Sequence, residues 1–236
     1  MSNWFQSVSA AAVVVACAAP ALAQTVHRSP DHWSITIPEG WELDTGERLA
    51  AFNQAATDLA ATMQGAPAVK YTALLIPKQP DGRYILLQTQ PAFPPGARLS
   101  DLQAVLDESS RRVQGELKQA SVDSTFAPVL DRERSRVIMT GRVVVPGQDP
   151  SGMLSITNFG VANNVLVHAY APEATFAAAR PGLEAIADSF AFDPGHAYEF
   201  RADGIDWKRV FITAAVCGVV GSIVGGIMQK LKPKAA

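Results

Sequence analysis

The feature that most constrains this chain is an uncharged apolar run near its C-terminus. The run Val210–Met228 contains 19 residues without a charge, about 28 Å of α-helix, which is close to the thickness of a bilayer's hydrocarbon core. A core helix of a globular domain usually carries a polar stripe, and this run has none. We therefore predict a transmembrane helix over residues 208–229. Its membrane-interface residues are an aromatic anchor and the flanking cations, namely Trp207, Lys208, Arg209, Lys230 and Lys232.

Small residues recur along the predicted transmembrane helix at intervals of four, and two glycines form a G-x-x-x-G pattern. Such spacing makes a flat face on which a second helix can approach closely. The predicted helix-packing residues are Ala214, Gly218, Gly221, Ser222, Gly225 and Gly226. Small residues are also common in membrane helices that do not associate, so two interpretations stay open. The helix either binds a partner helix or a second copy, or it serves as an anchor alone.

The N-terminal segment is typical of an export signal. A short apolar stretch over residues 8–19 is followed by Pro20 and then by Ala21-Leu22-Ala23, which fits the A-x-A pattern of a cleavage site. We predict a signal peptide over residues 1–23, cleaved before Gln24, although the segment lacks the usual Lys or Arg near its start. Two alternatives remain, because the sequence before Cys17 loosely resembles a lipidation site and because the segment has the apolar character of an uncleaved membrane helix.

The orientation follows from both ends of the chain. An export signal places residues 24–207 outside the cytoplasm, and lysines after the apolar run favour a cytoplasmic C-terminus. Residues 230–236 are therefore predicted to be a short basic cytoplasmic tail. Together with the Ala-rich signal, this predicts a protein of the bacterial inner membrane with its main domain in the periplasm.

The charge distribution argues against nucleic-acid binding. Residues 24–207 carry all 22 acidic residues but only 15 of the 20 Lys and Arg, a net charge of −7. The remaining cations flank the predicted transmembrane helix, so the exported part has no basic face for phosphates. Both cysteines, Cys17 and Cys217, lie in the apolar ends. The exported part therefore has no disulfide or thiolate metal site, and an oxidising compartment suits it.

The exported part has the sequence pattern of an α+β domain. In its first half, "HWSITIPEGWELDTG" predicts two strands around a turn, and "VKYTALLIPK" with "RYILLQTQ" predicts a hairpin. Residues 49–63 and 100–117 have helical spacing. In its second half, four strands are predicted in "FAPVLDRE", "RVIMTGRVVV", "MLSITNFGV" and "VLVHAYAP". We expect the last two to turn at Asn163-Asn164, and Pro181 to restart a final helix over residues 176–190. Hairpins interleaved with helices predict an antiparallel sheet covered by helices.

Two segments resemble a known family. The early "WSITIPEGW" and the closing "FAAARPGLEAIADSFAF", around a run of antiparallel strands, are similar to the PsbP-like fold over residues 28–193. The family includes the extrinsic photosystem protein and many exported bacterial domains. The resemblance implies a binding or assembly module and supplies no catalytic residues. The predicted transmembrane tail departs from the usual member.

No constellation of catalytic or ligand-binding residues stands out in the exported part. The histidines form no H-x-H or H-x-x-x-H pair, and no phosphate-binding or nucleophile-elbow motif occurs. His168, in the middle of a predicted strand, is expected to be a partly buried, hydrogen-bonded residue. We therefore predict no catalytic, cofactor-binding or metal-binding residues.

Three functions are consistent with these observations. The favoured one is a membrane-anchored, non-enzymatic module that binds a protein partner as an accessory subunit of an envelope complex. The alternative is a periplasmic domain that binds a small molecule or lipid, which requires an apolar cavity of roughly 300 Å³ or more. The third is a hydrolase, which requires His168 to meet a nucleophile and an acid in one cleft.

Overall fold

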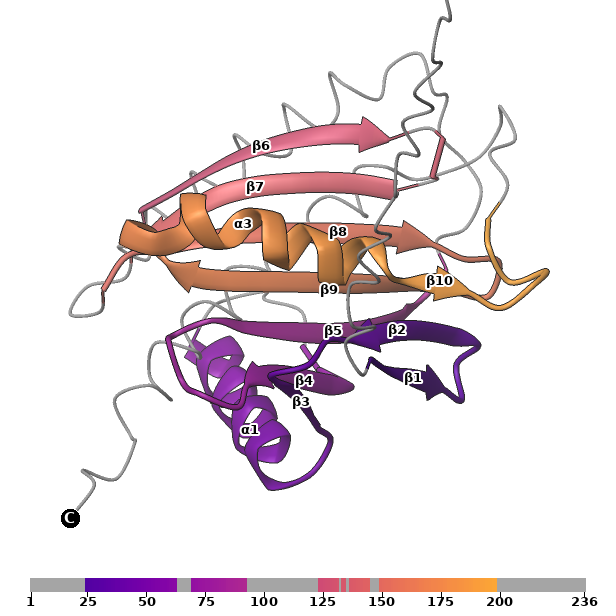
Figure 1. The fold of residues 1–236 in the computed structure, drawn as a ribbon, viewed down its shortest axis with the longest axis horizontal. Helices are drawn as coiled ribbons and strands as arrows, with labels where there is room; N and C mark the ends of the chain where they lie inside the picture. Colours follow the sequence, from indigo (N-terminus) through magenta and orange to yellow (C-terminus); the bar gives the residue numbers. More distant parts are fainter. Residues whose placement is uncertain are drawn as a thin grey trace, which may run out of the picture.

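Two antiparallel sheets and two helices make up the described part of the molecule (Figure 1). The structure is a computed structural model that describes residues 24–62, 69–92, 123–131, 133–134, 136–144 and 149–198. The smaller sheet has the strand order β1-β2-β10 and the larger one the order β3-β4-β5-β9-β8-β7-β6. The expected α+β class with antiparallel pairing is confirmed.

The smaller sheet forms from the alternating segment at the start of the exported part. It comprises β1 (Thr25–Ser29), β2 (Trp33–Ile37) and the short β10 (Ala191–Phe192). Strand β2 buries Trp33, Ile35 and Ile37 and leaves the residues between them partly exposed. The alternation is visible in the sequence, and it places one face of the sheet against the core.

The larger sheet contains the central core strands. Its members are β3 (Trp41–Asp44), β4 (Ala73–Pro77), β5 (Tyr84–Pro91), β6 (Asp123–Asp131), β7 (Arg136–Val144), β8 (Ser151–Phe159) and β9 (Asn163–Pro172). Strands β8 and β9 are buried at nearly every position. Both faces of the sheet centre are therefore covered, although the sheet is antiparallel throughout.

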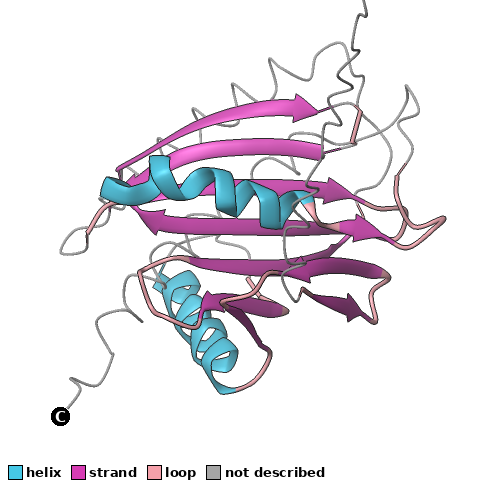
Figure 2. Cartoon of the chain, viewed as in Figure 1, coloured by secondary structure: helices cyan, strands magenta, loops and turns pink. Residues whose placement is uncertain are grey.

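The two helices lie on the outside of the sheets (Figure 2). Helix α3 (Glu173–Asp188) packs across β8 and β9 and inserts Leu183, Ile186 and Ala187 into the core. Helix α1 (Glu47–Thr62) lies beside β3 and β4. It brings the Phe52 ring within 5.7 Å of the Tyr84 ring. Tyr84 belongs to the sheet face opposite α3, because its neighbour Ile85 points into the α3 core.

Two sequence-based expectations are wrong in detail. The turn before β9 lies at residues 160–162 rather than at Asn163-Asn164, because Asn164 already pairs with Phe159. Tertiary contacts select this turn: Val161 N donates to His196 O at 2.9 Å, and a Cβ on Gly160 would lie 2.3 Å from Asn163 O.

Pro181 does not restart a helix, because α3 continues through it without a break. The carbonyl of Ala177, four residues earlier, loses its helical donor there. Both residues are exposed, so water can satisfy that carbonyl.

Several predictions concern residues outside the described ranges. They are the signal peptide over residues 1–23, the helix over residues 100–117, the cytoplasmic tail over residues 230–236, and the transmembrane helix over residues 208–229 with its packing and interface residues from Trp207 to Lys232. Within the described ranges, no helix combines the length and apolar character needed to cross a membrane.

Candidate functional site

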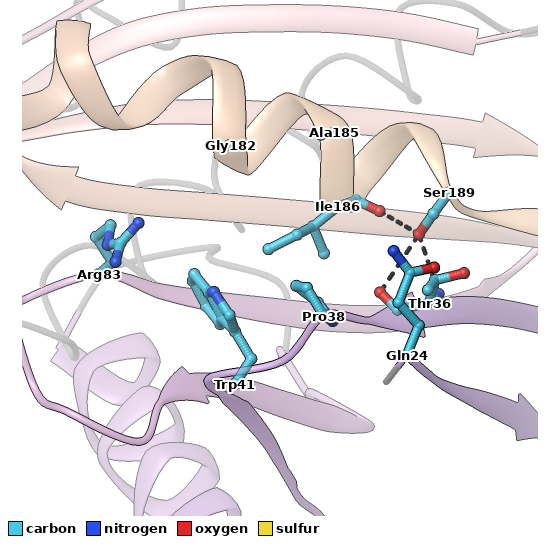
Figure 3. Close-up of a pocket in the computed structure, with 9 residues that line it drawn as sticks. All are labelled: Gln24, Thr36, Pro38, Trp41, Arg83, Gly182, Ala185, Ile186 and Ser189. Atoms are coloured by element: carbon cyan, nitrogen blue, oxygen red, sulfur yellow. Dashed lines mark hydrogen bonds between the residues drawn. The ribbon is translucent and has the colours of Figure 1, made fainter. Parts of the chain in front are cut away.

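A surface groove between α3 and the β2–β3 connection is the strongest candidate site. It encloses about 340 Å³ and opens to solvent. Figure 3 shows its walls converging from the start of β1, the end of β2, the start of β3, the residue before β5, and the last turns of α3. The lining residues are Gln24, Thr36, Pro38, Trp41, Arg83, Gly182, Ala185, Ile186 and Ser189.

One half of the groove is built around an aromatic ring and a cation. The Arg83 guanidinium carbon lies 5.4 Å from the centroid of the Trp41 ring, within the range of a cation–π interaction. Arg83 Nε also donates to Asp81 Oδ2 at 2.7 Å. Partial burial acts to raise the pKa of Asp81, but hydrogen bonds from Arg83 outweigh it and hold that pKa below its ordinary value. Arg83 is therefore held in place as the cationic wall of the groove.

The other half of the groove is polar and already hydrogen-bonded. The Ser189 hydroxyl accepts from Thr36 N at 3.0 Å and donates to Ile186 O at 2.6 Å (Figure 3). This hydroxyl fastens the C-terminal end of α3 to β2. It is therefore occupied by structural hydrogen bonds and is not poised as a nucleophile.

A second cavity lies between the β1–β2 hairpin and α1. It encloses about 460 Å³. Its apolar walls come from Trp33, Leu49 and Tyr71, and its polar lining includes His27, Asn53 and Lys70. Burial lowers the pKa of His27, which keeps this imidazole neutral. Both cavities thus exceed the roughly 300 Å³ that a small-molecule site requires, and both mix apolar with polar walls.

His168 meets a serine, but in the interior of the protein. Its Nδ1 lies 2.9 Å from Ser155 Oγ, and the two residues are 0% and 1% exposed. Neither residue lines either cavity. Burial lowers the pKa of His168 to about 3. The expected hydrogen bond is present, whereas burial is complete rather than partial, because the facing strands and Tyr71 enclose the ring.

Two histidines distant in sequence pair at the surface, and no local pattern predicts this pair. The rings of His32 and His196 stack with centroids 3.9 Å apart, and Asp193 Oδ2 lies 3.7 Å from His32 Nδ1. Their loops are joined by a hydrogen bond from Asp193 N to His32 O at 2.9 Å. Among the described residues, no group of three or more His, Cys, Asp or Glu is arranged to hold a metal ion.

None of the groove residues stands out in the sequence as a site residue. Trp41 and Pro38 form part of a turn motif, and Arg83 and Ile186 belong to a predicted strand and a predicted helix. Because the groove walls come from segments that lie far apart in the sequence, no local pattern could have identified them. The predicted membrane residues, in contrast, lie outside the described ranges.

Sequence comparison with known proteins finds no match, whereas comparison of structures does. No protein-family model matches the chain, and no curated protein matches it in sequence. Among solved structures, the chain is similar to cyanobacterial PsbP (CyanoP) from Synechocystis sp. PCC 6803, with a TM-score of 0.49 and 11% sequence identity. The match covers 79% of this chain and 98% of that one. That protein is a member of the family that the sequence resembles, and we take no residue role from it.

Proposed function

We propose that this chain is a membrane-anchored extracytoplasmic module that binds a protein partner and catalyses no reaction. In this proposal, residues 24–207 form the exported domain, residues 208–229 anchor it in the bacterial inner membrane, and the partner belongs to an envelope membrane complex. The groove between α3 and the β2–β3 connection is the contact site on the exported domain.

The observation that carries the proposal is the make-up of the groove. Trp41 is partly exposed and backed by the core, and its ring packs against a guanidinium held by Asp81. Tryptophan and arginine are the residue types most enriched at the centres of protein interfaces. The opposite wall, on α3, combines the small residues Gly182 and Ala185 with the apolar side chain of Ile186. A protruding side chain or short segment of a partner would therefore meet a rigid aromatic anchor on one side and a shallow, largely apolar helix surface on the other.

The burial of His168 and Ser155 supports binding over hydrolysis. A serine–histidine pair needs a cleft in which the nucleophile reaches its substrate. This pair is sealed from solvent and lines neither cavity. In addition, a histidine whose pKa is about 3 is a poor proton acceptor at neutral pH.

The anchoring part of the proposal rests on sequence. The uncharged run from Val210 to Met228 is long enough to span a bilayer, and its small-residue face suits contact with another helix. The exported domain and the membrane helix are therefore two separable sources of partner recognition, and an experiment can distinguish them.

The test is an affinity purification of the tagged full-length protein in mild detergent. Gly182→Gln and Ala185→Gln would fill the groove without disturbing the core, since both positions are exposed. Ala177→Gln, on α3 but outside the groove, is the matched control. We expect the double groove variant to lose a co-purifying membrane protein by tenfold or more, and the control to retain it.

A second variant tests the predicted helix face. Changing Gly218, Gly221, Ser222 and Gly225 to Leu would remove the small-residue surface. If this variant loses the partner while the groove variant keeps it, recognition occurs in the membrane and the groove assignment is wrong. If no protein co-purifies with any form, the proposal of a protein-binding module fails.

The second cavity favours one alternative function, the binding of a small amphipathic molecule. Trp33, Leu49 and Tyr71 offer an apolar wall, while Lys70 and Asn53 supply polar groups at its margin. Native mass spectrometry of the detergent-purified full chain would reveal a retained small molecule. Displacement of that molecule by Leu49→Trp, with Ala177→Gln as a control, would favour this alternative.

A further inference from the structure

Gln24 occupies an unusual place in the described chain. It lies at the edge of the groove beside Thr36 and Ser189 (Figure 3). It immediately precedes β1, whose pairing with β2 begins one residue later at Thr25↔Ile37. The residue is exposed, and it precedes the first paired position of the strand ladder. Its side-chain amide can therefore approach its own backbone nitrogen without breaking the sheet.

The predicted cleavage before Gln24 would turn this backbone nitrogen into a free α-amine. An N-terminal glutamine can then cyclise: the α-amine nitrogen attacks the side-chain amide carbon Cδ and forms a five-membered lactam. The Cδ–Nε2 bond breaks, and the departing nitrogen takes up a proton from the attacking amine and leaves as ammonia. No oxidant, reductant or co-reactant is needed. The product, pyroglutamate, carries no terminal charge.

We infer that Gln24 becomes the N-terminal residue of the mature chain, closes to pyroglutamate, and forms part of the edge of the groove as a neutral lactam. The inference rests on the export that the proposed function includes, and it goes beyond that function by assigning a covalent modification to the site. The structure explains why such a change matters there. Arg83, the cation among the described lining residues, is paired with Asp81. A free α-ammonium at residue 24 would add a positive charge that no carboxylate among the described lining residues offsets, and the lactam removes this charge while keeping polar N–H and C=O groups.

The identity of the mature N-terminus can be read from a single tryptic peptide, because Arg28 is the first Lys or Arg in the chain. Trypsin therefore releases the mature terminus as the short peptide 24–28. An uncleaved chain yields a peptide that starts at residue 1 or 2, and a lipidated chain yields one that starts at Cys17. Full-length tagged protein would be produced in an exporting bacterium and purified from membranes. Its amines would be labelled before digestion, so that any cyclisation during digestion is recognised.

The expected result is the peptide 24–28 without an amine label and lighter than its sequence by one ammonia. Gln24→Ser is the matched control, since its terminus is cut at the same place and keeps a labelled amine. A labelled, full-mass glutamine at residue 24 would overturn the inference and leave the export part of the proposed function intact. A terminus at any other residue would overturn the inference and the predicted cleavage together. Neither outcome alters the groove-variant purification, so the failure of each idea can be recognised separately.

Discussion

His168 illustrates how strongly a single buried side chain depends on its surroundings. It lies on β9 with its ring fully enclosed and one nitrogen hydrogen-bonded to Ser155. The other nitrogen, Nε2, has no hydrogen-bond partner among the described residues. An imidazolium in this place would lose its hydration without gaining an anion, and for this reason the pKa of His168 falls to about 3. The ring is therefore a neutral structural element.

This burial predicts a pH dependence of stability. Between the ordinary histidine value of 6.5 and the native pKa of about 3, the unfolded chain binds a proton that the folded chain does not. Stability must therefore fall as the pH decreases through that window. From pH 6.5 to pH 5 the expected loss is about 2 kcal/mol. Chemical denaturation of the wild type and of His168→Gln at both pH values would measure it, with the variant showing a shallower slope. Equal slopes would contradict this assignment.

Of the two described helices, α3 makes the closer contact with the sheet. A Cβ on Gly152 of β8 would lie 2.2 Å from the Phe176 ring of α3. At the other end of the helix, Arg136 donates to Asp188 Oδ1 at 2.6 Å and to Asp131 Oδ2 at 2.9 Å. Gly152 thus lets one end of the helix approach β8 closely, and the ion-paired Arg136 holds the other end. These two contacts determine where the groove wall lies.

Two glycines give this element a matched test. Gly152→Ala must displace Phe176, and overpacking of this kind costs about 1–3 kcal/mol. Gly182→Ala, on the exposed face of α3 with no atom within 4 Å of the new Cβ, should stabilise the protein by about 1 kcal/mol through helix propensity. Thermal unfolding would show shifts of opposite sign. A Gly152→Ala protein as stable as the wild type would mean that α3 packs differently.

At the scale of the whole molecule, we propose that the chain consists of an acidic exported domain and an apolar membrane anchor. Deletion of residues 208–236 removes the predicted transmembrane helix and leaves the exported domain with its net charge of −7. We expect the full chain in the membrane fraction and the deleted form in the soluble periplasmic extract. Washing the membranes with high salt is the control, since it releases proteins that are held by surface charge alone. A deleted form that stays in the membrane would point instead to the N-terminal segment as the anchor.

The sequence alone determined the local elements of the domain and much of its class. Alternation at Trp33, Ile35 and Ile37 predicted β2 because a pleated strand places every second side chain on one face. The spacing of Leu183 and Ile186 predicted the buried face of α3 for the equivalent helical reason. The signal peptide and the membrane anchor stay predictions from short contiguous segments, on which cleavage chemistry and bilayer thickness act.

Only the tertiary structure decided the turn at residues 160–162, the complete burial of His168 and the groove itself. The turn depends on a hydrogen bond to His196, and the groove brings Trp41 and Arg83 opposite the last turns of α3. These features depend on contacts between residues distant in sequence, which form only when β5, β9 and β8 have paired. Local propensity does not describe such contacts. The position of a binding surface therefore follows from packing rather than from any local motif.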